Sequence, residues 1–332
     1  MDKKNITIAD IAKEMGVSKT TVSRAISGKG RIGNETREKI LKYIEKKEYK
    51  PNVVAQGLAK SCTYNIGVAM PEDYCTVDAP FFINCLAGMH QTASLRGYDI
   101  LVTVFDNDDI SNLERIVVNR KVDGIILMRS FIEDKGIKML KNRGMPFVVV
   151  GSSEEEGVMQ IEQDNEGGCR ELTSILLMKK LNRIALIGGN ENYSVTQKRL
   201  KGFLGAFKEM GVVPRKELIY MNSDSPASIE WVVDSILDKG VDCIVCMDDN
   251  ICSHVLNKLK KSKISVPEQM KVASFFNSNI LDNNIPSITS LSYDVKNIGM
   301  LACKVLIKMI EKEDIEPINN IGYDIVLKES TK

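Results

Sequence analysis

Residues 7–28 read TIADIAKEMGVSKTTVSRAISG, and this stretch decides the fold of the first part of the chain. Thr7 precedes Asp10 by three positions, which is a variant of the capping box that begins helices. Apolar residues then recur at helical spacing until Gly16, a residue type common at helix ends. Ser18 follows as the N-cap of a second helix. A turn this short joins two helices at a steep angle, so the stretch predicts a helix-turn-helix.

The second helix, predicted over residues 18–26, has an apolar and a polar face. The apolar face holds Val22, Ala25 and Ile26. The other face carries Lys19, Thr20, Ser23 and Arg24. A third helix is predicted to begin near residues 33–34, and its apolar residues Ile40, Leu41 and Ile44 close a three-helix core.

Charge is distributed unevenly along the 332 residues. Residues 1–60 contain 14 Lys and Arg against 7 Asp and Glu, whereas the rest of the chain carries 31 against 37. A basic head on a mildly acidic body is typical of a nucleic-acid-binding module joined to a domain that does not bind nucleic acid. Charge alone is equally consistent with a solvated helical surface.

Residues 7–61 resemble the DNA-binding head of the LacI family of transcription regulators, with matches at fixed offsets. The resemblance implies that the second helix enters the major groove with Lys19, Thr20 and Arg24 toward the base edges. Arg24 suits a bidentate contact with guanine, whereas Lys19 suits either a base or a phosphate. The candidate DNA contacts in the head are Thr7, Ser18, Lys19, Thr20, Thr21, Ser23 and Arg24. The alternative is a three-helix module that binds another protein.

Residues 51–59, PNVVAQGLA, predict a helix of about two turns, which is too short to be stable alone. The resemblance implies a hinge helix that pairs with its dimer mate in the minor groove and pushes Leu58 between base pairs. The candidate DNA contacts there are Asn52, Ala55, Gln56 and Leu58. Many family members carry Arg-Ser where this chain has Gln56-Gly57, and Gly57 costs up to about 1 kcal/mol of helix propensity. The hinge is therefore expected to depend strongly on DNA and dimer contacts, although Leu58 also suits a linker residue that only packs.

From Tyr64 onward, apolar strands alternate with amphipathic helices, which predicts parallel sheets covered on both faces. The predicted strands are 64–70, 98–104, 122–128, 146–150, 183–187, 241–247, 270–275 and 321–327, and the predicted helices include 82–95, 166–180, 197–210, 227–239, 251–261 and 297–311. The resemblance extends here more weakly, to a periplasmic-binding-protein-like effector domain of two Rossmann-like halves. The fold class expected is α/β, with a three-helix helix-turn-helix domain at 1–50, a hinge at 51–62 and an effector-binding and dimerisation domain at 63–332.

Ligand residues are expected in loops after strands. The candidates are Phe81, Phe82, Asp164, Arg199, Asp248, Phe276 and Asn277. The resemblance implies that Arg199, in Arg-x-x-Gly-Phe, contacts the effector. Core packing for Phe82 and helix capping for Asp164 are equally good interpretations.

One departure from the family pattern concerns the ligand. Phe276 replaces an aspartate that often holds a sugar hydroxyl, so Phe276 is expected to stack on a sugar face and Asn277 to supply the polar contact. The local sequence loosely resembles that of maltose-operon regulators of the same family. The effector is expected to be a carbohydrate or a sugar phosphate.

Other classes of protein find little support in the residues. The eight cysteines include one C-x-x-C, at 243 and 246, but no second pair completes a zinc site, so no metal and no cofactor is expected. An enzyme that uses sugars or nucleotides on the same scaffold is the competing hypothesis, yet neither a phosphate-binding loop nor a nucleophile elbow is present. A transport receptor is the third hypothesis. No apolar run is long enough for a membrane helix and no export signal precedes the head, so the protein is expected in the cytoplasm.

The sequence therefore predicts a transcription regulator that binds a pseudo-palindromic operator in double-stranded DNA and responds to a small effector. Repression is expected more than activation. A homodimer is expected, because two recognition helices one turn apart match such an operator. Whether the effector releases or promotes DNA binding is left open.

Overall fold

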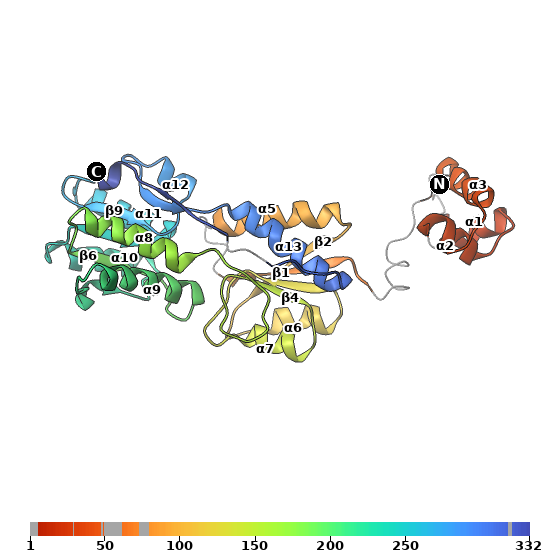
Figure 1. The fold of residues 1–332 in the computed structure, drawn as a ribbon, viewed down its shortest axis with the longest axis horizontal. Coiled ribbons are helices and arrows are strands. Elements are labelled where there is room, and N and C mark those ends of the chain that lie inside the picture. The colour runs from red at the N-terminus through yellow and green to blue at the C-terminus, as the bar shows by residue number, and fades with distance from the viewer. Residues whose placement is uncertain (1–5, 29, 48, 50–61, 73–79, 318–320) are drawn as a thin grey trace. The chain divides into compact units, whose positions relative to one another are not determined.

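The structure is a computed structural model that describes residues 6–332 except 29, 48, 50–61, 73–79 and 318–320. The chain divides into two compact units, Met1–Thr63 and Tyr64–Lys332 (Figure 1). The predicted hinge contacts Asn52, Ala55, Gln56 and Leu58 lie outside the described residues.

The first unit consists of α1 (Ile8–Glu14), α2 (Lys19–Ser27) and α3 (Asn34–Lys46). The predicted capping box is confirmed, because Thr7 accepts a hydrogen bond from the Asp10 N–H and the Asp10 carboxylate accepts one from the Thr7 N–H. Ser18 caps α2 through the Thr21 N–H, also as predicted. Gly28 ends α2 with a φ of 69°, a left-handed conformation that glycine adopts at little cost.

The core of this unit is small and comes from all three helices. Its buried members are Ile11, Ala12, Val22, Ala25 and Ile40. Leu41, predicted in the core, is 39% exposed, because successive helical residues point about 100° apart and Ile40 already faces inward.

The second unit has two halves, each built on one sheet. In the first half, the sheet contains β1 (Asn65–Pro71), β2 (Asp99–Phe105), β3 (Gly124–Leu127), β4 (Phe147–Val150) and β5 (Gln160–Ile161), all parallel, in the order β2-β1-β3-β4-β5. Helices α5 (Pro80–Leu95) and α13 (Val295–Glu311) share one hydrophobic cluster with this sheet, and α6 (Ser111–Val118) and α7 (Lys135–Asn142) share another. The sheet is therefore covered on both faces.

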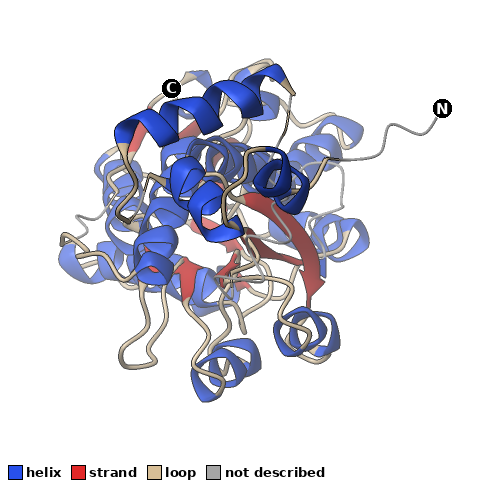
Figure 2. Ribbon diagram, turned by 90° about the vertical axis from the view of Figure 1, so that its right-hand side faces the viewer, coloured by secondary structure: helices blue, strands red, loops and turns tan. Residues whose placement is uncertain are grey.

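The second half repeats this winding. Its strands are β6 (Ile184–Ile187), β7 (Ile219–Tyr220), β8 (Cys243–Cys246), β9 (Lys271–Ser274), β10 (Thr289–Ser292) and β11 (Asp324–Val326), in the order β11-β10-β9-β8-β6-β7, with only β11 antiparallel. Its helices are α8 (Asn165–Met178), α9 (Ser194–Glu209), α10 (Pro226–Leu237), α11 (Asp249–Lys261) and α12 (Asn279–Asp282), with short 3-10 turns at Lys216–Leu218 and Glu329–Thr331. Figure 2 shows the strands lying among the helices.

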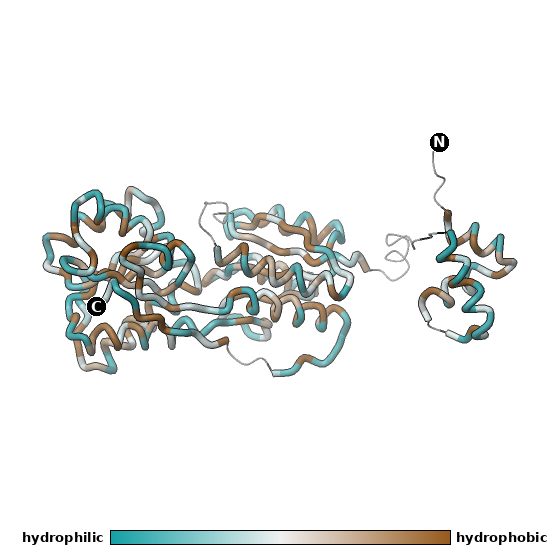
Figure 3. The backbone as a smooth tube through the Cα atoms, turned by 90° about the horizontal axis from the view of Figure 1, so that it is seen from above, coloured by the Kyte–Doolittle hydropathy of each residue, from teal (hydrophilic) through white to brown (hydrophobic). Residues whose placement is uncertain are grey.

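The chain crosses between the halves after β5, after β10 and again after α13. Helices α5 and α13 lie side by side in the first half because Gly88 and Gly299 leave room for their backbones to approach (Figure 1). Hydrophobic and hydrophilic positions alternate along the helices, as amphipathic packing requires (Figure 3).

The predicted fold class is confirmed, and each predicted strand overlaps an observed one. The short strands β5, β7 and β10 were not predicted. In the described part of the chain, no helix has the length and apolar character that a bilayer crossing requires.

Candidate functional sites

The exposed face of α2 carries the predicted DNA contacts. Lys19, Thr20, Ser23 and Arg24 are exposed and Thr21 is half-buried. Within the described residues, neither Lys19 nor Arg24 forms an ion pair, so both charges remain available to a partner. The apolar residues Val22 and Ala25, fully buried beneath this face, hold the helix in place.

The hydroxyls of Thr7 and Ser18 are engaged in the helix caps. Thr7 Oγ1 donates to Asp10 Oδ2 at 2.7 Å, and Ser18 Oγ lies 2.9 Å from Thr21 Oγ1. These contacts fix the beginnings of α1 and α2, whose first turns are where phosphate oxygens are commonly bound. A helix that exposes short polar groups and a guanidinium on one face fits the major groove.

The second unit contains a cavity of about 260 Å³ between its halves. It is lined by residues that follow β1 and β3 in the first half and β6 and β8 in the second. In both sheets these are the neighbouring strands at which the strand order reverses. Open parallel sheets bind ligands at this switch point, beyond the carboxyl ends of the strands.

The cavity brings together five of the seven predicted effector residues. Phe81, Phe82, Arg199, Asp248 and Phe276 line it. The other two, Asp164 and Asn277, are not among its lining residues.

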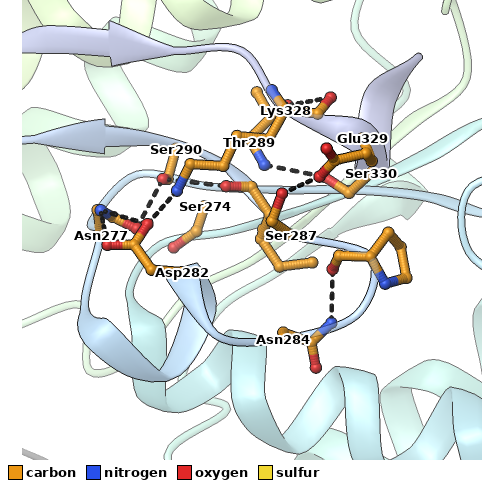
Figure 4. Close-up of polar contacts among 12 residues, drawn as sticks. Ser274, Asn277, Asp282, Asn284, Ser287, Thr289, Ser290, Lys328, Glu329 and Ser330 are labelled. Atoms are coloured by element: carbon orange, nitrogen blue, oxygen red, sulfur yellow. Dashed lines mark hydrogen bonds and ion pairs between the residues drawn. The ribbon is translucent and has the colours of Figure 1, made fainter.

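Asp164 and Asn277 have structural partners instead. Asp164 caps α8 by accepting a hydrogen bond from the Gly167 N–H at 2.8 Å. Asn277 donates to the Asp282 carboxylate and accepts from the Ser290 hydroxyl at 2.9 Å, within a polar network that joins the loop after β9 to the C-terminal residues (Figure 4). Both side chains hold loops that flank the cavity.

Aromatic rings form one wall of the cavity. The Phe81 ring packs edge-on against Phe82 and Phe276, at centroid distances of 5.4 and 5.8 Å. Phe276 also stacks on Tyr293 at 6.3 Å. The Phe276 N–H donates to the buried Ser274 hydroxyl, which fixes the turn that presents the ring.

Arg199 lies buried among polar partners. Its Nη1 donates to the Met247 carbonyl oxygen at 2.6 Å, and its Nε donates to Asn165 Oδ1 at 3.3 Å. Asp248 caps α11 through the Ile251 N–H at 2.8 Å. Burial raises the pKa of Asp248, and the hydrogen bond from Ile251 and the charge of Arg199 oppose that rise.

Asp249 and Gln163 add hydrogen-bonding capacity to the cavity. Burial, reinforced by the neighbouring Asp248 carboxylate, raises the pKa of Asp249 to about 6. Gln163 Oε1 is buried and accepts no hydrogen bond from the described residues. A buried acceptor without a partner is costly, so a ligand whose hydroxyl donates a hydrogen bond to Gln163 Oε1 would be favoured here.

Sequence reasoning missed several lining residues. They include Arg129, Ser130, Gln163, Asn165, Asn190, Tyr193, Thr196, Asp224, Asp249 and Asn250. Most of them lie shortly after a strand, as Arg129 lies after β3 and Asn190 after β6. Their place at the carboxyl end of a predicted strand could therefore have identified them as candidate ligand residues. Gln163 follows β5, a two-residue strand too short to be recognised from a pattern.

The described residues contain no group of three or more His, Cys, Asp or Glu side chains able to hold a metal. Cys243 and Cys246 are both fully buried in β8, and burial raises the pKa of each thiol. Thiols in such surroundings are poor metal ligands and poor nucleophiles.

Both units match known families. Residues 7–52 match the family described as bacterial regulatory proteins, lacI family, and residues 173–331 match the periplasmic binding protein-like domain. The regulator RegA of Clostridium saccharobutylicum is 28% identical over 98% of this chain and 99% of its own. MalR of Streptococcus pneumoniae is 28% identical over 92% of this chain and 99% of its own.

Solved structures of transcription regulators are also similar to this chain. A complex of the transcriptional regulator CelR with cellobiose is similar with a TM-score of 0.75 and 25% identity, over 98% of this chain and 99% of that one. The lac repressor dimer bound to operator and the anti-inducer ONPF shares the fold, with a TM-score of 0.82, 20% identity and 99% of each chain covered.

A helix-turn-helix unit and a two-sheet ligand-binding unit on one chain define a DNA-binding transcriptional regulator. The chain carries a LacI-family DNA-binding domain followed by a periplasmic-binding-protein-like domain.

Proposed function

We propose that the protein is a repressor that binds a pseudo-palindromic operator as a homodimer, and that a small sugar in the cavity sets its affinity for DNA. The observation that carries this proposal is the cavity itself, which lies at the switch points of both sheets. A ligand that contacts both halves favours one arrangement of the two, and a change in that arrangement reaches the DNA-binding unit through residues 51–62, which we take as the hinge.

A sugar suits the chemistry of the cavity. The rings of Phe81, Phe82 and Phe276 offer an apolar surface for the C–H face of a pyranose. Arg199, Asp248 and Gln163 offer planar polar groups for its hydroxyls. A similar structure supports this choice, since CelR was solved with cellobiose.

A sugar phosphate is the second candidate, because two arginines, Arg129 and Arg199, line the cavity. The buried carboxyl groups of Asp248 and Asp249 beside them offset that positive charge. An uncharged sugar is therefore the first choice.

We further propose that the protein binds its ligand without converting it and acts where the DNA is, in the cytoplasm. The relatives are regulators, which favours binding over catalysis. Recovery of a bound sugar unchanged after prolonged incubation, checked by chromatography, supports this; a new product would revive the enzyme hypothesis.

The test combines two measurements on the full-length protein. A thermal-shift screen with maltose, cellobiose and glucose 6-phosphate identifies a ligand, since binding to the folded state raises its stability. Fluorescence anisotropy with DNA from the neighbourhood of the protein's own gene then measures operator affinity with and without that ligand. A ligand-dependent change in affinity supports the proposal, and failure to bind any of that DNA contradicts it.

The substitution Arg199→Met tests the cavity, with Arg143→Met as the matched control on an exposed arginine that pairs with Glu114. Arg199→Met is expected to abolish the ligand response, and also to lower stability by about 1–3 kcal/mol because it leaves the buried Met247 carbonyl without its donor. The Arg143→Met control is expected to keep both the ligand response and the stability of the unchanged protein. A full response in Arg199→Met would remove this cavity as the effector site.

A further inference from the structure

Two loops from opposite halves of the second unit pair with each other beside the cavity. One loop follows β3 and contains Phe131; the other follows β6 and contains Tyr193. The Ile132 N–H donates to the Asn192 carbonyl at 3.0 Å, and the Ser194 N–H donates to the Ser130 carbonyl at 3.1 Å. These bonds make an antiparallel bridge in which Phe131 lies opposite Tyr193.

Side chains strengthen this bridge. The Tyr193 ring packs edge-on against Phe131 at 5.4 Å, and Phe131 packs against Phe105 at 5.8 Å. Phe105 is 2% exposed and belongs to a hydrophobic cluster of the first half. A ring from the second half is thereby anchored on the core of the first.

Arg129 adds a charged contact between the halves. Its guanidinium lies 4.2 Å from the centroid of the Tyr193 ring and 5.3 Å from that of Phe82. Phe82 belongs to α5 of the first half, and Tyr193 immediately precedes α9 of the second. All three residues line the cavity, so the guanidinium spans from one half to the other at the ligand site.

We propose that Arg129 is a positioning residue that holds the cavity closed by stacking on Tyr193, together with the backbone bridge between residues 130–132 and 192–194; we call this set of contacts the clasp. Its contacts join opposite halves across the cavity, so separation of the halves breaks them together. The clasp therefore opposes ligand exit and sets how readily the halves separate. The proposal rests on the proposed function only in taking the cavity as the effector site.

Hydrogen–deuterium exchange of the full-length protein, without any ligand, tests the clasp directly. The reporters are the Ile132 and Ser194 amides, whose hydrogen bonds exist only when the halves meet. Arg129→Met and Tyr193→Leu are each expected to speed exchange at both amides by about five- to tenfold, from the usual strength of a partly desolvated cation–π contact. Arg143→Met, the exposed control, is expected to exchange as the unchanged protein does.

Exchange in β8, recorded in the same spectra, reports whether a variant is folded. A variant that loses protection there is replaced by Arg129→Lys, which keeps a cation over the ring and for which the clasp predicts a smaller, local increase. Unchanged exchange at Ile132 and Ser194 in the folded variants, or an equal increase in Arg143→Met, overturns the proposal. Because no ligand is used, a failed search for a sugar leaves this result intact.

Discussion

Arg24 is the exposed α2 side chain that combines a fixed positive charge with a planar set of donors. Its neighbours on that face are short or, like Lys19, present a single ammonium group. A guanidinium can bond both acceptors of a guanine edge at once, whereas an ammonium acts as a point charge. We therefore expect Arg24 to specify sequence and Lys19 to add affinity.

Replacing Arg24 with alanine should cost about 1–3 kcal/mol of operator binding per half-site contact and relax base preference at one position. Anisotropy titrations against operators with single base changes measure this. Lys39→Ala, on the exposed surface of α3 where Lys39 pairs with Glu35, is the control. An unchanged base preference in the Arg24 variant would remove Arg24 from the residues that read sequence.

Asp249 is a residue at which stability and pH are linked. Its pKa in the folded protein is about 6, above the ordinary value of 3.8, so the folded state holds this proton more tightly than the unfolded state. The stabilisation by that proton is present at low pH and is lost as pH rises through about 6.

Asp249→Asn removes the ionisable group, so the variant does not lose stability through it as pH rises. Relative to the unchanged protein, the free energy of unfolding of the variant should rise by about 1–2 kcal/mol between about pH 5 and about pH 7.5. Urea denaturation at the two pH values measures the change, and Asp238→Asn, on an exposed residue, serves as the comparison. If the variant and the unchanged protein differed in free energy of unfolding by the same amount at both pH values, burial would not be what holds Asp249 protonated.

At the scale of elements, the packing of α5 against α13 connects the core of the first half to the cavity. Phe81 and Phe82 at the beginning of α5 and Ile298 near the beginning of α13 line the cavity. The two helices approach so closely that a Cβ on Gly299 would collide with the backbone carbonyl of Cys85. Backbone atoms cannot rotate aside as a side chain can, so the helices themselves would have to separate.

Gly299→Ala should thus destabilise the protein by about 1–3 kcal/mol through overpacking. Gly205→Ala, in α9, makes the same chemical change where the nearest atom, Arg170 Cδ, is 3.5 Å away, and should stabilise by about 0.5–1 kcal/mol through helix propensity. Chemical denaturation of both variants gives the comparison. Equal effects of the two substitutions would mean that close helix packing is not what requires glycine at 299.

At the scale of the whole molecule, the two units have separate cores, so DNA binding and ligand binding are coupled only if a ligand changes how the units of a dimer meet DNA. Coupling free energies in such systems are typically about 1–3 kcal/mol. A ligand found in the screen should therefore change operator affinity by about 5–150-fold, and operator DNA should change ligand affinity by the same factor.

Calorimetric titration of ligand with and without operator, beside sedimentation of the free protein, measures this linkage. Sedimentation at twice the mass of one chain is expected, with two helix-turn-helix units on one pseudo-palindrome. A ligand that binds equally well with and without operator would show that the two sites are independent.

The sequence alone determined the features that depend on neighbours along the chain. The caps at Thr7 and Ser18, the beginning of α3 near Asn34 and the alternation of strands and helices after Tyr64 are local patterns, and the structure confirms them. Ligand residues could be expected after strands because parallel strands end at a common edge, and five of seven predicted residues line the cavity.

Only the tertiary structure decided which strand ends meet across the two halves. Asp164 and Asn277 follow strands as Asp248 and Phe276 do, yet they bond to residues of α8, α12 and β10 that do not line the cavity. Arg129 and Tyr193 are far apart in the sequence, and no local pattern links them. Their contact exists because two separately folded halves close on each other, an arrangement that follows from long-range packing and not from the spacing of residues along the chain.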